Sequence, residues 1–218
     1  MVLHPAVLGL GSSDNALQMH PAPVTCLTFV DDQVVASGSS LGNVSVTDLS
    51  TGQQVATMRS RNLADIRTLC LHHSSKLLFA ASTSGHVSCL DLRKLRSLWE
   101  TRVSSNVIYS MNHLQNDSSL LVTGGIDGVI RTLDQNNGEV TSRCIMDEST
   151  AVPYSSTDKF GLIGRRKGRR LPEDARLDLM PKTSRPLITC LAVGMQKIVT
   201  THNEKYIRVW RFGNEKEI

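Results

Sequence analysis

Four segments of the chain share one pattern of apolar, small and polar positions. Each segment begins with apolar residues, continues through small residues and a turn, and ends in a run of alternating apolar and polar residues. They read VVASGSSLGNVSVTD (34–48), LLFAASTSGHVSCLD (77–91), LLVTGGIDGVIRTLD (120–134) and KIVTTHNEKYIRVWR (197–211). A segment that recurs about every 40 residues is typical of a solenoid or a propeller. The pattern therefore predicts a binding surface rather than an enzyme fold with one buried active site.

A β-branched residue opens each unit, at Val24, Ile66, Val107 and Ile188. The openings are 42, 41 and 81 residues apart, and the last interval is close to two periods. Residues 145–187 therefore hold either a degenerate fifth unit or a loop inserted between two units, and both interpretations stay open.

Each unit is predicted to consist of four strands, which in the first unit span residues 24–30, 34–37, 44–49 and 54–58. Period-2 alternation and closely spaced turn residues indicate strands joined by hairpins, and Asp127-Gly128 suits a tight turn that needs positive φ. Four strands per unit at this period fit the blade of a β-propeller. The expected fold is all-β, a propeller of four clear blades or five. Since seven blades need roughly 280–300 residues and the chain has 218, we expect the propeller to be incomplete.

The chain divides accordingly into five parts. Residues 1–20 are expected to be the tail of a preceding blade or an irregular N-terminus, and 21–144 three repeats. The basic insertion or degenerate repeat follows at 145–187, the final repeat at 188–212 and a tail at 213–218.

The units resemble those of the WD-repeat family, which end in Asp-Gly-x-Ile-x-x-Trp-Asp. Residues 127–134 match this ending with Asp127, Gly128, Ile130 and Asp134. In the family, a His before the first strand, a Ser or Thr, the turn Asp and the Trp form a hydrogen-bonded tetrad inside a blade. No unit here has all four. The resemblance implies blade-structural roles for His20, Ser37, Asp48, Asp91, Thr123, Asp127, Asp134, Thr200 and Trp210.

The stretches at 168–181 and 188–212 are similar to the propeller part of plant F-box/WD-repeat proteins. In that family an F-box joins the adaptor of a cullin-type ubiquitin ligase, and the propeller holds the substrate. No part of this sequence looks like an F-box, so the resemblance implies ligase subunits as partners only through an F-box that this chain lacks.

Positive charge is concentrated in one segment. Residues 159–170 carry six cations and no acid, so the net charge of +4 leaves about −2 for the rest of the chain. A solvated loop, a nuclear-localisation signal and a contact with nucleic acid are the three interpretations of such a run. Its cations are Lys159, Arg165, Arg166, Lys167, Arg169 and Arg170.

The sequence predicts no catalytic site, cofactor or metal. His72-His73 lacks a third ligand at a suitable spacing, and none of the five cysteines lies in a Cys-x-x-Cys pair. Cys26 and Cys190 occupy the same Thr-Cys-Leu place in their units, where a free thiol acts as a small hydrophobe. No apolar run is long enough for a membrane span and no signal peptide is recognised. We therefore expect a cytoplasmic or nuclear protein without a membrane partner.

The leading functional hypothesis is a non-catalytic scaffold that binds a protein or peptide on the propeller rim. The expected rim positions are His20, Leu41, Asn62, Ser84, Ser104, Asp127, His202 and Glu204. Arg67, Arg131 and Arg208 either present guanidinium groups to an acidic or phosphorylated partner or are ordinary charges on strand surfaces. The alternatives are a nuclear component of RNA or chromatin assemblies that uses residues 159–170, and a truncated product without a function of its own.

Overall fold

The computed structural model of the chain describes residues 19–114, 119–145, 152–153, 171, 177, 179, 185–203, 205 and 207–211. Almost all of the described chain is strand or turn. The strands are β1 (Val24–Phe29), β2 (Val34–Ser39), β3 (Asn43–Asp48), β4 (Gln54–Arg59), β5 (Ile66–His72), β6 (Leu77–Ser82), β7 (His86–Asp91), β8 (Arg96–Arg102), β9 (Ile108–His113), β10 (Leu120–Gly125), β11 (Ile130–Asp134), β12 (Val140–Cys144), β13 (Val152–Pro153), β14 (Ile188–Val193), β15 (Lys197–His202) and β16 (Ile207–Arg211).

These strands form four antiparallel sheets in which chain neighbours pair. Blade 1 is β1 to β4, blade 2 is β5 to β8, blade 3 is β9 to β12 with β13 added at its outer edge, and blade 4 is β14 to β16. Blades 1 to 3 each have the four expected strands, whereas β16 is the outermost described strand of blade 4.

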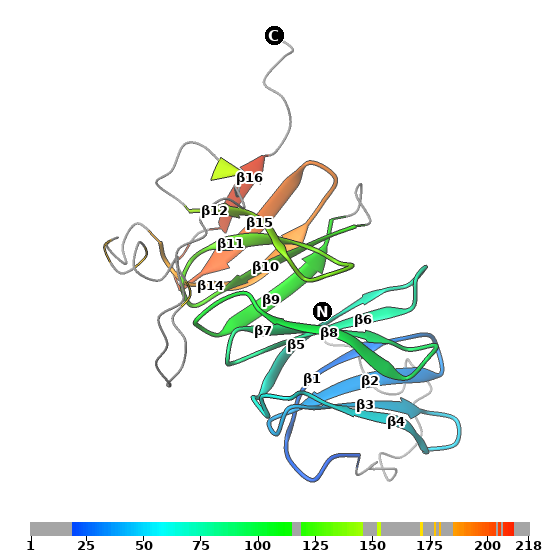
Figure 1. Ribbon diagram of the computed structural model, residues 1–218. Helices are drawn as coiled ribbons and strands as arrows, with labels where there is room; N and C mark the ends of the chain where they lie inside the picture. The colour runs from blue at the N-terminus through cyan, green and yellow to red at the C-terminus, as the bar shows by residue number, and fades with distance from the viewer. Residues whose placement is uncertain are drawn as a thin grey trace.

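Figure 1 shows the blades following one another as an arc, from blade 1 in blue at one end to blade 4 in orange and red at the other. The innermost strands β1, β5, β9 and β14 contact one another in this order. The expected all-β, incomplete propeller of WD-type blades is confirmed. The sequence left two interpretations of residues 145–187, a fifth unit or an inserted loop. The described residues of this range include β13, and most of the others lie outside the described residues, as do residues 1–18 and 212–218.

A bulge near the start of each innermost strand fixes the register of the blade. The bulges place Val24, Ile66, Ile108 and Ile188 at one equivalent position, opposite the last residue of the second strand. The third unit therefore begins its inner strand at Ile108 and not at Val107, as the sequence indicated. A slip of one residue exchanges the two faces of a strand, and accordingly Ile108 is buried while Val107 is half-buried.

The core of the protein lies between blades. One apolar cluster joins blade 1 to blade 2, a second joins blade 2 to blade 3, and a third joins blade 3 to blade 4. Small residues make the close approach possible: a Cβ on Gly38 would lie 2.7 Å from Ile66, and a Cβ on Gly124 would lie 2.9 Å from Ile188. Each blade is thus held by its neighbours, because one antiparallel sheet cannot bury both of its faces by itself.

No helix among the described residues is long and apolar enough to cross a membrane.

Candidate interaction rim

One edge of the arc collects the turns between second and third strands together with the connections between blades. Since the strands of a blade are antiparallel, these segments lie at the same edge, which we call the rim. Backbone hydrogen bonds of 2.9 Å join the connections to the turns. The Ser60 amide donates to the Gly42 carbonyl, and the Val103 amide donates to the Gly85 carbonyl. The rim comprises residues 19–23, 40–42, 60–65, 83–85, 103–107, 126–129 and 185–187.

In blade 1, His20 and Ser37 are bonded as the family resemblance implied. His20 Nε2 lies 2.8 Å from Ser37 Oγ, and both side chains are buried. Burial lowers the pKa of His20. The remaining two positions of the tetrad hold Leu41, which is exposed, and Thr47, whose buried hydroxyl has no hydrogen-bond partner within the described residues. His20 is therefore a blade-supporting residue rather than an accessible contact.

In blade 2, serines and a histidine replace the tetrad. Ser84 Oγ lies 3.0 Å from Ser82 Oγ and 2.9 Å from His86 Nδ1. Asn62, at the family His position, instead donates to Glu100 on β8 at 2.9 Å.

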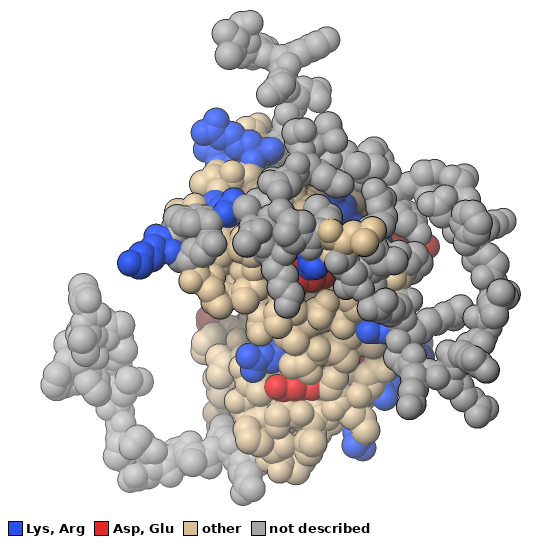
Figure 2. Space-filling model, turned by 90° about the vertical axis from the view of Figure 1, so that its left-hand side faces the viewer, with Lys and Arg blue, Asp and Glu red and all other residues tan. Residues whose placement is uncertain are grey.

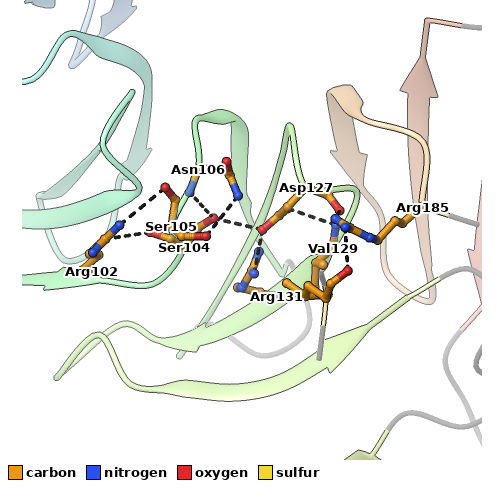
Figure 3. Close-up of polar contacts among 9 residues, drawn as sticks. Arg102, Ser104, Ser105, Asn106, Asp127, Val129, Arg131 and Arg185 are labelled. Atoms are coloured by element: carbon orange, nitrogen blue, oxygen red, sulfur yellow. Dashed lines mark hydrogen bonds and ion pairs between the residues drawn. The ribbon is translucent and has the colours of Figure 1, made fainter. Parts of the chain in front are cut away.

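In blade 3, Asp127 is the centre of a buried polar group (Figure 3). Its carboxylate accepts from Ser104 Oγ at 2.9 Å and from the Val129 amide at 3.1 Å. The Arg131 guanidinium lies 2.7 Å from Asp127 Oδ2, and both side chains are at most 3% exposed. Arg185 donates to the Asp127 carbonyl at 3.3 Å and to the Leu177 carbonyl at 2.6 Å, which ties the connection before β14 to this turn.

The position of Arg131 differs from the expectation that it presents a guanidinium to a partner. Its side chain reaches back along β11 to Asp127, four residues earlier, and is covered by the surrounding chain. Ser104 and Asp127, which were also expected on the accessible rim, are buried with it. Thr123, at the hydroxyl position of this blade, is buried and has no hydrogen-bond partner among the described residues.

Blade 4 contains a hydrogen-bonded triad of Thr200, His202 and Trp210. Trp210 Nε1 donates to Thr200 Oγ1 at 2.9 Å, and Thr200 Oγ1 lies 2.9 Å from His202 Nε2. His202 Nδ1 lies 3.1 Å from the Leu187 carbonyl. Because a carbonyl oxygen only accepts, Nδ1 carries the proton and Nε2 accepts from the Thr200 hydroxyl.

His202 also lies elsewhere than the sequence analysis expected. It was expected among the accessible rim positions, but it is buried and bonds to the blade's hydroxyl residue, as the family's His before the first strand does. It comes instead from the end of β15, two residues after Thr200. In the sequence, this role was indicated only by a His two residues after the hydroxyl position, in a unit that also retains the Trp of the family.

The aspartates at the end of the third strand in blades 1 to 3 lie at the opposite edge of the arc. Asp48, Asp91 and Asp134 each cap the turn that follows by accepting the backbone amide two residues later, at 2.8, 2.9 and 2.7 Å. The hydroxyl and amide of Ser50 lower the pKa of Asp48. These three residues shape turns and are remote from the rim.

Several exposed residues lie at the rim of blades 1 and 2. Leu41, Asn62 and Leu63 are exposed there, and we call these three, together with the exposed Arg67 at the start of β5, the rim surface. The turn of Leu41 touches the next connection, since a Cβ on Gly42 would lie 3.0 Å from the backbone of Leu63.

The two remaining arginine candidates differ in their surroundings. Arg67 is anchored by Asp65 at 3.9 Å and by the ring of Tyr109 at 5.8 Å, with 41% of its side chain exposed. Arg208 is half-buried on β16 of blade 4, whereas Arg67 lies on β5 of blade 2, so the two side chains belong to different blades.

Residues 159–170, with all six cations of the basic segment, lie outside the described residues, as does Glu204. Figure 2 shows the Lys and Arg side chains of one face in separate small groups rather than in a continuous basic stripe. The interpretations of the basic segment therefore stay predictions.

The cysteines are free thiols. Burial raises the pKa of Cys70 to about 11 and that of Cys89 to about 12, as expected for thiols in the core. Within the described part of the chain no three His, Cys, Asp or Glu residues gather as metal ligands would.

The chain is similar to known proteins both in sequence and in fold. No family model matches it. It is 47% identical, over 191 residues, to an F-box/WD-40 repeat-containing protein of Arabidopsis thaliana. The alignment covers 87% of this chain and 42% of that relative, so the chain spans less than half the length of its relative.

Three solved structures have a similar fold. A computationally designed protein, Ika4, superimposes with a TM-score of 0.63 at 17% identity, covering 94% of this chain and 100% of that protein. A chain of the mitotic checkpoint complex matches with a TM-score of 0.60 at 15% identity, over 86% of this chain and 47% of that one. U3-55K matches with a TM-score of 0.63 at 12% identity, over 90% of this chain and 51% of that one. The repeated blades and these three structures show a propeller fold of WD-type blades, and the chain is similar over most of its length to part of an F-box/WD-40 repeat-containing protein.

Proposed function

We propose that the chain is the substrate-binding part of an F-box/WD-type ubiquitin-ligase subunit. The WD-repeat family supports a protein-interaction scaffold. The ligase role rests on the relative of 47% identity, whose name includes an F-box.

The rim surface is the proposed contact. Leu41 and Leu63 offer apolar area at 48% and 49% exposure, and Arg67, at the start of β5, offers a charged fork. Arg binds carboxylate and phosphate groups through paired hydrogen bonds. The surface therefore suits a segment that carries an apolar residue next to an acidic or phosphorylated one.

The buried groups of the rim support this contact from below. Bonds such as His20 to Ser37 hold the turns and connections at the rim in fixed positions. A surface built on such supported turns loses little conformational freedom when it binds, which favours affinity.

Crosslinking in cells tests the proposal. The chain is expressed as wild type and as Leu63→Asp, with Leu98→Asp on β8 as an equally exposed control. A substrate receptor captures proteins through Leu63 and not through Leu98, and the half-lives of those proteins lengthen when the gene is disrupted. If the half-lives of the captured proteins do not change, the ligase role is contradicted. If Leu63→Asp captures the same proteins as the wild type, the rim surface is not the contact.

A further inference from the structure

The carboxylate of Glu100 on β8 accepts three hydrogen bonds from the connection between blades 1 and 2. Its Oε1 atom accepts from Ser60 Oγ at 2.7 Å and from Asn62 Nδ2 at 2.9 Å. Its Oε2 atom accepts from the Arg61 amide at 3.2 Å. These donors lie 38 to 40 residues before Glu100 in the chain. A side chain of blade 2 therefore holds three consecutive residues of the chain that leaves blade 1.

A carboxylate suits these three partners better than other side chains do. All three are donors, one O–H and two N–H groups, so the group that holds them must accept on both of its polar atoms. The amide of a glutamine would turn its nitrogen, which donates, toward one of them. The equivalent positions of blades 1 and 3 are Thr57 and Arg143, neither of which carries two acceptor oxygens. Among these three blades, the arrangement is therefore particular to Glu100.

The next connection shows what such a segment does without this carboxylate. Residues 103–107 lie between β8 and β9, whereas residues 60–65 lie between β4 and β5, so the connection that Glu100 holds is one residue longer. In the shorter connection the Val103 and Ser104 amides both donate to the Gly85 carbonyl, at 2.9 and 3.1 Å. Two successive amides are thus bonded to the neighbouring turn.

The longer connection departs from this arrangement at its second residue. The Ser60 amide donates to the equivalent Gly42 carbonyl at 2.9 Å, but the Arg61 amide donates to Glu100. The Leu63 amide then donates to the Ser60 carbonyl at 3.3 Å, and Leu63 has a φ of 51°. A leucine at positive φ is strained, and such a conformation persists only where its surroundings hold it. The longer connection is therefore folded into a tight turn that ends at Leu63.

We propose that Glu100 is the positioning residue of the rim surface. Its three hydrogen bonds keep Leu63 at positive φ, with the side chain turned outward at 49% exposure. This role rests on the proposed function, because it assigns Glu100 to the contact that Leu63 makes with a protein partner. Glu100 acts through the connection and needs no contact with the partner. A surface that is held in its binding conformation in advance loses less conformational freedom on binding.

Amide hydrogen exchange of the whole chain, followed by NMR, tests whether Glu100 holds the connection. Glu100→Ala should speed the exchange of residues 61–63 about tenfold and leave residues 103–107 at the wild-type rate. Glu100→Asp keeps the charge, is one methylene shorter and should also speed exchange at residues 61–63. The control is Glu139→Ala, which removes an exposed acid from the turn between β11 and β12 and should change neither connection.

Two results of this experiment would overturn the proposal. If both connections exchange faster by the same factor, Glu100 stabilises the protein as a whole and does not position Leu63. If neither variant changes the exchange of residues 61–63, Glu100 does not hold the connection.

Affinity measurements test the effect of this positioning on binding. The probe is the phosphorylated peptide that the wild-type chain binds most tightly in a peptide library, titrated by fluorescence anisotropy. Glu100→Asp should weaken its binding about tenfold, and the retained charge excludes an altered attraction for the phosphate. Leu63→Asp should add little to this loss, because coupled positions are not additive. Strictly additive losses, or an unchanged affinity for Glu100→Asp, would overturn the positioning role.

The two experiments also separate this proposal from the proposed function. If no peptide of the library binds the wild type, the proposed function is contradicted. The exchange rates of residues 61–63 still decide, in that case, whether Glu100 positions Leu63.

Discussion

Asp127 and Arg131 form a buried ion pair, with Asp127 Oδ2 2.7 Å from the guanidinium. The pair lies inside blade 3, beneath the rim, and takes the place of the family's tetrad there. Ser104 and the Val129 amide complete the hydrogen bonds of the carboxylate. The pair therefore fixes the turn between β10 and β11 and the connection that enters blade 4.

Replacement of Arg131 by Met is expected to destabilise the protein by about 3–5 kcal/mol, because it leaves a buried carboxylate without its counter-charge. Urea unfolding measures the loss. Arg96→Met, at an exposed arginine on β8, is the control and should stay within about 0.5 kcal/mol of the wild type. A cost for Arg131→Met that equals the control would show that the pair contributes nothing.

Trp210 and Thr200 are expected to be energetically coupled. Trp210→Phe removes one hydrogen bond and should cost about 1 kcal/mol, and Thr200→Val removes the same bond together with the one to His202. A double-mutant cycle from urea unfolding should give a coupling of about 0.5 kcal/mol or more. Strictly additive effects would mean that the bond seen at 2.9 Å does not stabilise blade 4.

Leu95 is a position where glycine should stabilise the fold. Gly52, Leu95 and Gly138 occupy the same place, four residues after the capping aspartate of their turns, and all have positive φ (68°, 50° and 74°). Leu95 is exposed, so Leu95→Gly relieves backbone strain without opening a cavity and should gain about 0.5–1 kcal/mol. Gly52→Ala is the reverse control and should lower the thermal midpoint; a lower midpoint for Leu95→Gly would contradict the argument.

Stability is expected to fall as pH drops from about 6.5 to 4, because burial and the nearby His72 lower the pKa of His113 to about 4. The unfolded chain binds a proton at His113 in this window and the folded chain does not, so the stabilisation is complete above the unfolded pKa and is lost below it. The rings of His113 and Phe79 lie 5.1 Å apart in the core between blades 2 and 3.

Urea midpoints at pH 7 and pH 5 measure this dependence. His113→Phe keeps an aromatic ring at the site and should reduce the difference between the two midpoints. Since burial also lowers the pKa of His20 and His86, part of the decline should persist in the variant. An unchanged difference would show that His113 does not titrate in this window.

The repeated strand pattern was sufficient to predict the blades, because strand pairing within a blade is local and follows period-2 alternation. The family resemblance implied blade-structural roles for His20 and Ser37, and the structure places the two side chains 2.8 Å apart. The pattern could not show that His202 is buried, since the ring is held by the Leu187 carbonyl in the chain before β14. It could not show that Arg131 is buried, because the burial depends on distant parts of the chain, such as Arg185, which bonds to the carbonyl of Asp127 58 residues earlier.

The burial of equivalent positions in different blades was equally beyond prediction from the pattern. Val24 and Ile66 occupy the same position in their blades, but Val24 is 51% exposed and Ile66 is 1% exposed, because blade 1 precedes Ile66 and no described blade precedes Val24. The rim surface was predicted in part, by Leu41, Asn62 and Arg67. Leu63 joins it because the connection after β4 adopts positive φ there (51°) and turns the side chain outward.

Peptide binding at the rim surface tests the account most directly. The chain is screened against a library of phosphorylated peptides and their unphosphorylated forms, and the tightest binder is titrated by fluorescence anisotropy. We expect Arg67→Ala to weaken binding about tenfold, a loss of about 1.4 kcal/mol, and Arg96→Ala to leave it unchanged. Equal affinities for both variants and the wild type, or a library without a binder, would contradict the claim that this rim holds a protein partner.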